Sequence, residues 1–204
     1  MSESNPNSRL ETFCDGVFAI ALTLLIIDIK IPSDKEIHGT QDFWKVLYEM
    51  LPSVCAFLLS FFVILITWVN HHQTMLLVHK TSTSFIYANA LLLLTVVFIP
   101  FPTALIGEYI FTNHPSPALI LYNVTLALGA ISWVLISVSA LKNNLAKSEH
   151  AKKMLRQNKF FGFFACALYL VCAFISIWFP LTIAAVTVII WLFWFVYGIS
   201  LKHE

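Results

Sequence analysis

The sequence predicts an all-α membrane protein, a single domain over residues 1–204 with six transmembrane helices. Hydrophobic residues make up 59% of the chain and charged residues 11%, and the mean hydropathy is +0.81. Soluble domains carry about 25% charged residues. Six apolar stretches alternate with short polar segments, and apolar stretches of about 20 residues are typical of helices that cross a bilayer. The net charge of +1 carries no information about partners, and no nucleic-acid partner is expected.

The first predicted span covers residues 9–31 and has an acidic residue near each end. Only twelve uncharged residues, 16–27, separate Asp15 from Asp28. They form roughly 18 Å of helix, whereas the hydrocarbon core is roughly 30 Å thick. A carboxylate that faces lipid is costly, so this helix requires protein or water around it.

At about 100° per residue, the first span has two faces. One narrow stripe, flanked by Thr23 and Asp28, consists of Arg9, Phe13, Gly16, Ile20, Leu24, Ile27 and Ile31. The opposite side carries Glu11, Cys14, Asp15, Phe18, Leu22, Leu25 and Ile29. We expect Asp15 to point into its own subunit, where it requires a hydrogen-bond donor. The aliphatic row is then left to face something else.

The other five spans are predicted at residues 43–70, 84–101, 118–141, 160–179 and 181–201. The second contains Pro52 near its start and ends in the polar sequence Trp68-Val-Asn70-His71-His72. Pro100 interrupts the third, small residues in the fourth allow close helix approach, and the last two flank a tight turn at Pro180.

The distribution of basic residues predicts the orientation. Nine Lys and Arg residues fall on the side of the two termini, six of them in the connector 142–159, and three fall on the other side. The positive-inside rule therefore places both termini of this multi-pass protein in the cytoplasm, at the cell membrane. The basic connector is equally suited to contact anionic lipid headgroups.

The N-terminus and the cysteines indicate no further processing or cofactor chemistry. Residues 1–8 lack the pattern of a signal peptide, so the first apolar segment is expected to be retained. The cysteines show neither a disulfide framework nor zinc spacing, and we interpret them as packing residues: Cys14, Cys55, Cys166 and Cys172.

The segment Arg9-x-x-x-Phe13-Cys14-Asp15 resembles the R-x-x-x-F-S-D signature of the transmembrane protein 175 family. These are potassium channels of endolysosomes and their prokaryotic relatives. The following Gly-Val-Phe-Ala-Ile-Ala-Leu-Thr-Leu-Leu is similar to the prokaryotic, single-repeat branch, and the resemblance covers nearly the whole chain. Cys14 departs from the usual Ser, and a thiol is a weaker hydrogen-bond partner than a hydroxyl, so we expect a looser polar contact there.

The resemblance implies a potassium-permeable channel and not an enzyme, with no cofactor apart from permeant K⁺. Its partners would be further copies of the chain, potassium ions and membrane lipids. Eukaryotic relatives carry two copies of the six-span unit, so a one-copy chain would form a homotetramer. The resemblance further implies that the first span of each subunit lines a central pore, and that bulky aliphatic side chains constrict it, here Ile20, Leu24 and Ile27.

Such a pore has no carbonyl filter, and the sequence contains no Thr-Val-Gly-Tyr-Gly loop. An apolar ring closes by dewetting. A ring of Thr23 hydroxyls would replace part of the hydration shell of a cation, so we assign selectivity to Thr23. Asp28 would raise the local cation concentration at the pore mouth, or would instead form a salt bridge with Lys30 or Lys35.

The end of the second span supplies the donors that Asp15 requires. In the predicted topology Trp68, Asn70, His71 and His72 lie at the membrane depth of Arg9 and Asp15, and the resemblance implies a polar network within the subunit. Asn89 or Tyr87 of the third span would complete it. The alternative is that the histidines are merely interfacial. A metal or haem site at His71 and His72 is not favoured, because adjacent helical residues diverge by about 100° and no further ligand has the required spacing.

Two other functions compete with the channel. A proton-coupled carrier or a membrane enzyme would use Asp15, His71 and His72 to bind substrate or transfer protons. The clustering of these groups at one membrane boundary, with no charge at mid-depth, disfavours both. A scaffold without transport is the third possibility.

Overall fold

The computed structural model describes residues 7–30 and 39–200, and within these ranges every regular element is a helix. The elements are α1 (Ser8–Leu24), the 3₁₀ helix η1 (Leu25–Asp28), α2 (Thr40–Glu49), α3 (Leu51–Leu76), α4 (Thr83–Phe98), α5 (Pro100–Tyr109), α6 (Ser116–Lys142), α7 (Glu149–Ile175) and α8 (Pro180–Ser200). Five segments are long and apolar enough to cross a membrane: Ser8–Ile27, Leu51–Leu76, Thr83–Tyr109, Ser116–Lys142 and Glu149–Ile175. The stretch Pro180–Phe193 of α8 is a shorter apolar helix.

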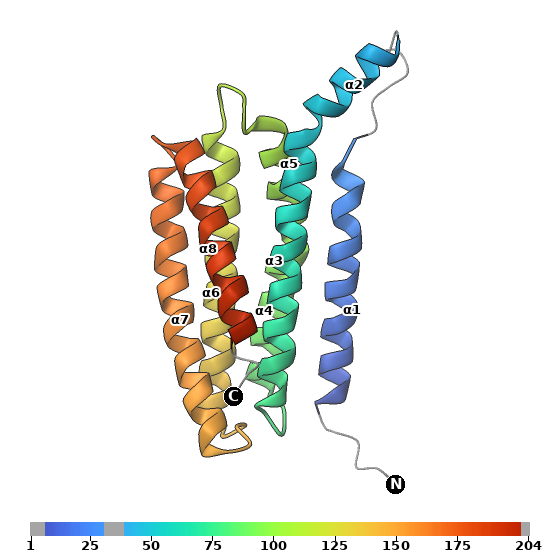
Figure 1. The fold of residues 1–204 in the computed structure, drawn as a ribbon. Coiled ribbons are helices and arrows are strands. Elements are labelled where there is room, and N and C mark those ends of the chain that lie inside the picture. The colour runs from blue at the N-terminus through green and yellow to red at the C-terminus, as the bar shows by residue number, and fades with distance from the viewer. Residues whose placement is uncertain (1–6, 31–38, 201–204) are drawn as a thin grey trace.

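The long helices lie side by side in an elongated bundle (Figure 1). The start of α1 and the end of α8 lie at the same end of this bundle (Figure 1). The helix pair α6 and α7 packs extensively, α4 packs on α6, and α3 packs on α5. Helix α1 lies at the edge of the bundle, where it contacts α3 and α4. One face of α1 is therefore covered by its own subunit, and the other is not.

The second predicted span, residues 43–70, is wrong at both ends. Residues Thr40–Glu49 form the separate helix α2, and α3 begins at Leu51, with Pro52 in its first turn. Proline lacks the N–H that an interior helical residue donates, and it is favoured at the first turn. At the other end, α3 continues to Leu76, six residues past the predicted end, because the polar side chains Asn70 to Thr74 do not disrupt a helix.

Two other boundaries differ from the predictions. Helix α5 begins at Pro100 directly after α4 and extends to Tyr109, so Pro100 and Pro102 occupy a first turn and do not end the segment. Helix α7 begins at Glu149, eleven residues before the predicted 160, after Ser148 caps it by accepting from the Ala151 N–H at 3.1 Å. Lysine and arginine are good helix formers, so most of the basic connector is helical.

The loops α3–α4 and α6–α7 are joined at the end of the bundle where α1 begins. The Lys147 N–H donates to the Leu77 carbonyl at 2.9 Å, and the His79 N–H donates to the Leu145 carbonyl at 3.0 Å. The Asn7 side chain donates to the Val78 carbonyl at 2.9 Å. These bonds fix the start of α1 to the α3–α4 loop, so the register of α1 along α3 is defined.

Helices α3 and α5 approach so closely at Gly107 that no side chain fits there. A Cβ atom at Gly107 would lie 2.8 Å from the Ser53 Cα. We expect Gly107→Ala to separate the helices and to destabilise the subunit by about 1–3 kcal/mol, lowering the melting temperature in detergent. The control is Gly129→Ala, whose Cβ would meet the Thr95 hydroxyl at an ordinary 3.5 Å. Equal melting temperatures for the two variants would contradict the prediction.

Candidate functional site

Helix α1 and η1 together present two chemically distinct faces. Four side chains on one face, Cys14, Phe18, Ala21 and Leu25, are at most 1% exposed because they pack into the bundle. The opposite face carries large apolar side chains that the described part of the chain leaves largely exposed: Phe13 (62% exposed), Ile20 (57%), Leu24 (41%) and Ile27 (71%). This is the two-faced distribution that the helical spacing predicts, and it leaves an aliphatic row unpaired along the length of the helix.

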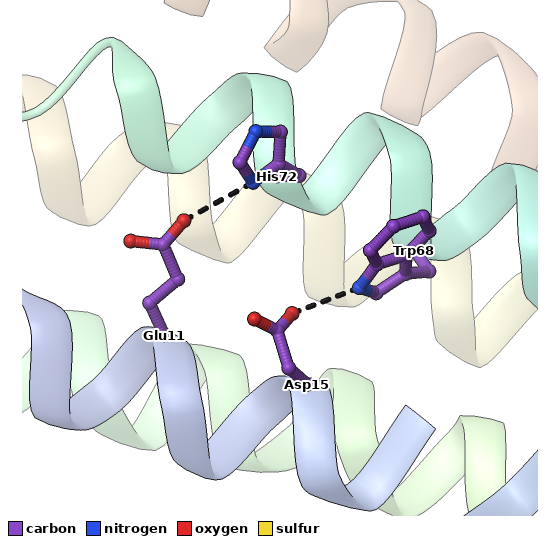
Figure 2. Close-up of polar contacts among 4 residues, drawn as sticks. All are labelled: Glu11, Asp15, Trp68 and His72. Carbon is purple, nitrogen blue, oxygen red and sulfur yellow. Dashed lines mark hydrogen bonds and ion pairs between the residues drawn. The ribbon is translucent and has the colours of Figure 1, made fainter. Parts of the chain in front are cut away.

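Two polar contacts join α1 to α3 on the covered side (Figure 2). The Trp68 indole N–H donates to the Asp15 carboxylate at 2.8 Å, and the His72 Nδ1 lies 3.1 Å from the Glu11 carboxylate. In both helices the two residues are four apart, so one turn of α1 faces one turn of α3. The Trp68 and His72 rings are stacked, with their centroids 6.3 Å apart. The structure thus brings Asp15 and Trp68 together, and it turns Asp15 toward its own subunit.

His71 forms a separate contact deeper in the bundle, between α3 and α4. Its Nε2 lies 2.9 Å from the Asn89 Oδ1, and the Asn89 Nδ2 donates to the Phe85 carbonyl at 2.7 Å. Because the amide nitrogen is already used, the oxygen of Asn89 accepts and His71 donates from Nε2. His71 is 1% exposed, and its ring lies 5.5 Å from that of Phe18. His71 and Asn89 therefore support the surface on which α1 packs, without contacting Asp15.

Other residues of the predicted network and of the signature motif lie apart from this cluster. Asn70 lines a cavity on another side of α3, Tyr87 is 72% exposed, and Arg9 is exposed. Cys14 is fully buried, and within the described residues its thiol forms no hydrogen bond. The position that carries Ser in the family signature is thus occupied here by a packing residue.

Thr23 is exposed beside the aliphatic row, and its hydroxyl donates to the Ile20 carbonyl of its own helix at 2.8 Å. The hydroxyl proton is thus engaged within α1, and the oxygen keeps its capacity to accept. The side chain of Asp28 lies outside the described residues, as does Lys35. Lys30, one of the predicted alternative partners of Asp28, instead forms a salt bridge with Glu108 of α5 at 3.0 Å.

Sequence reasoning placed Glu11 and Phe18 on the correct face of α1 but assigned them no role. The signal that identifies Glu11 is its spacing. Glu11 is four residues before Asp15, and His72 is four residues after Trp68. Because residues four apart lie on the same face of a helix, a contact between Asp15 and Trp68 also predicts a contact between Glu11 and His72. Among the described residues, no group of three or more His, Cys, Asp and Glu side chains is arranged to hold a metal ion. His71 contacts Asn89 and His72 contacts Glu11, so the two rings are not directed at a common metal ion.

The family model, two similar proteins and a similar solved structure are all described as potassium channels. Residues 9–100 match the family described as endosomal/lysosomal potassium channel TMEM175. A protein named potassium channel from Chamaesiphon minutus is 40% identical over 156 residues, which are 76% of this chain and 72% of the relative. A potassium channel from Streptomyces collinus is 36% identical over 89% of this chain and 88% of its own length. The crystal structure of a lysosomal potassium-selective channel TMEM175 homolog from Chamaesiphon minutus superposes with a TM-score of 0.77 at 36% identity, covering 93% of this chain and 98% of that one.

Proposed function

Because the chain belongs to the TMEM175 family, we propose that it forms a potassium-permeable cation channel whose pore is lined by α1. Four copies would surround a central axis, with Ile20, Leu24 and Ile27 constricting the pore. The Chamaesiphon and Streptomyces relatives are named potassium channels, which supports the proposed permeant ion. The channel would lie in the cell membrane, surrounded by lipid, with both termini in the cytoplasm.

One observation carries this proposal: the aliphatic row of α1 is exposed while both acidic residues on its other side are held by α3. The two polar contacts fix the rotation of α1, and they thereby fix the direction in which the aliphatic row points. With Asp15 and Glu11 turned inward by Trp68 and His72, the row points away from the subunit, toward the position that a symmetry-related copy would occupy.

Such a pore would be gated by an apolar constriction and not by a carbonyl filter. A narrow ring of isoleucine and leucine excludes water, because water in it loses hydrogen bonds, and an ion would have to shed its hydration shell. No cofactor takes part in this function. Asp28, at the end of η1, would contribute a negative charge at the mouth of the pore.

The same contacts argue against a carrier or an enzyme. In those functions Asp15, His71 and His72 would face a substrate, whereas Asp15 and His72 are engaged at the α1–α3 contact and His71 is buried against Asn89. We therefore propose no catalytic role for them. A scaffold without transport would show no ion flux at all.

The test is reconstitution of the purified protein in liposomes and planar bilayers. A channel passes potassium at electrodiffusive rates down its gradient, and the current reverses near the potassium equilibrium potential in mixed potassium and sodium. Flux that saturates at carrier rates and requires a proton gradient would overturn the proposal. Absence of potassium flux from a correctly assembled oligomer would favour the scaffold.

Thr23 is the proposed selectivity residue, and its removal should lower the preference for potassium. We expect Thr23→Ala to reduce the permeability ratio of potassium to sodium by about threefold or more, because the ring of hydroxyl oxygens that replaces part of the hydration shell is lost. Thr23→Ser keeps the hydroxyl and is the matched control. Bi-ionic reversal potentials measure the ratio, and an unchanged ratio in Thr23→Ala would remove Thr23 from the selectivity mechanism.

A further inference from the structure

A partly open cavity of about 230 Å³ lies between α3, α4, α6 and α7, with Trp191 of α8 in its wall. It exists because α3 packs on α5, and α6 packs on α7, while α3 and α7 are not in extensive contact. Drug-sized sites measure about 300–1,000 Å³, so this cavity is suited to a molecule with a single ring.

Three carboxamide side chains line one end of the cavity: Asn70 and Gln73 from α3 and Asn158 from α7. In the part of the chain that the structure describes, none of the three amides forms a side-chain hydrogen bond with another residue. Each offers two N–H donors and one carbonyl acceptor. Their end of the cavity is close to the start of α7 and the end of α3, which is also the end of the bundle where α1 begins (Figure 1).

The rest of the cavity is apolar and aromatic. Trp133 of α6, Phe161 and Tyr169 of α7 and Trp191 of α8 contribute ring surfaces, and Tyr169 and Trp191 stack with their centroids 6.3 Å apart. Aromatic rings favour planar partners in offset or edge contacts. No described residue that lines the cavity is charged, so a charged ligand would lose its hydration without gaining a counterion.

From these observations we propose that the cavity is a binding site for small, uncharged aromatic molecules that carry a carboxamide or an equivalent donor–acceptor pair. The ring packs against Trp133 and Phe161, and the polar group exchanges hydrogen bonds with Asn158 and Asn70. The site is separate from the proposed pore: Asn70 faces the cavity, whereas Trp68 and His72 of the same helix face α1. Binding can thus be measured without any assumption about ion conduction.

The probe is 4-fluorobenzamide, followed by ¹⁹F NMR in the presence of the full chain in lipid nanodiscs, with empty nanodiscs as the blank. We expect saturable binding that unlabelled benzamide displaces. Fluorobenzene, which lacks the amide, should bind more weakly, and 4-fluorobenzoate and 4-fluorobenzylammonium, which are charged, should not bind. No saturable binding of 4-fluorobenzamide, or equal binding of fluorobenzene, or tighter binding of either charged probe, overturns the proposal.

Variants locate the site. Asn158→Leu should weaken 4-fluorobenzamide binding by about three- to tenfold, the value of a net hydrogen bond, and leave fluorobenzene binding unchanged or stronger. Gln157→Leu is the matched control, because Gln157 is the exposed neighbour of Asn158 and does not line the cavity. Ala165→Phe, which fills the cavity, should abolish binding of both probes. Equal effects of Asn158→Leu and Gln157→Leu would place the bound probe elsewhere.

Discussion

Replacing Ile20 by asparagine is expected to increase potassium flux through the reconstituted protein by at least about tenfold, which corresponds to lowering the barrier by about 1.4 kcal/mol. In the proposed tetramer, four amide groups would enter the apolar ring at once. Each amide can hydrogen-bond to water, so the constriction would stay hydrated and an ion could pass without losing its shell. The measurement is potassium flux from liposomes at matched protein density, together with single-channel recording.

Two variants make this result specific. Ile20→Val keeps the ring apolar and should leave flux close to that of the wild type. Ile177→Asn places the same polar group on an exposed isoleucine in the turn after α7, where Ile177 is 51% exposed, and should not raise flux. If Ile20→Asn conducts no better than the wild type while retaining its oligomeric state, the constriction does not lie at Ile20.

The faces of α1 could be predicted from the sequence because helical spacing is a local property. Residues 14, 18, 21 and 25 recur at intervals of four and three, and any helix in this register places them on one side. A carboxylate inside a membrane requires a donor, and the end of the next span supplies a tryptophan at the correct depth. These two facts predict that Asp15 bonds to the end of the second span, with Trp68, Asn70 and a histidine as candidate donors, and the structure shows that Trp68 is the donor.

The parts that sequence reasoning missed depend on packing or on the position of a proline within a turn. Asn70 was grouped with Trp68 because both are polar and at the same depth, but two residues along a helix are separated by about 200°, and Asn70 faces the cavity instead. The α2–α3 boundary depends on whether Pro52 lies in the interior or in the first turn of a helix. The apolar pattern runs through both cases and does not distinguish them. A proline in the helix interior would cost one backbone hydrogen bond, and this cost favours the first turn.

The two contacts between α1 and α3 differ in their surroundings, and this difference has an energetic consequence. The Glu11–His72 pair is partly solvated, with side chains 23% and 44% exposed, and such pairs contribute at most about 1 kcal/mol. The Asp15–Trp68 bond lies further into the span, and hydrogen bonds to charged groups contribute about 1.5–3 kcal/mol. The rotation of α1 is therefore held mainly by Asp15 and Trp68.

Trp68→Phe is accordingly expected to lower the melting temperature of the detergent-solubilised protein by about 4–8 °C, which corresponds to about 2 kcal/mol for a chain of this size. The indole N–H is lost, and the Asp15 carboxylate stays partly buried without its donor. Asp15→Ala should cause a similar decrease, because it leaves the indole N–H unpaired. Size-exclusion chromatography after heating is the suitable readout, since it does not depend on tryptophan fluorescence.

The double variant Asp15→Ala/Trp68→Phe separates the bond from general effects on packing. If the two side chains interact directly, the double variant should be destabilised clearly less than the sum of the single variants, with a coupling of about 1–3 kcal/mol. Glu11→Ala and His72→Ala provide the matched comparison on the same pair of helices, and their coupling should be smaller. Additive effects of Asp15→Ala and Trp68→Phe would contradict the role of this bond in orienting α1.

The orientation of α1 also directs the aliphatic row toward the proposed axis. Potassium flux should therefore change in the variants in which the bond between Asp15 and Trp68 is broken.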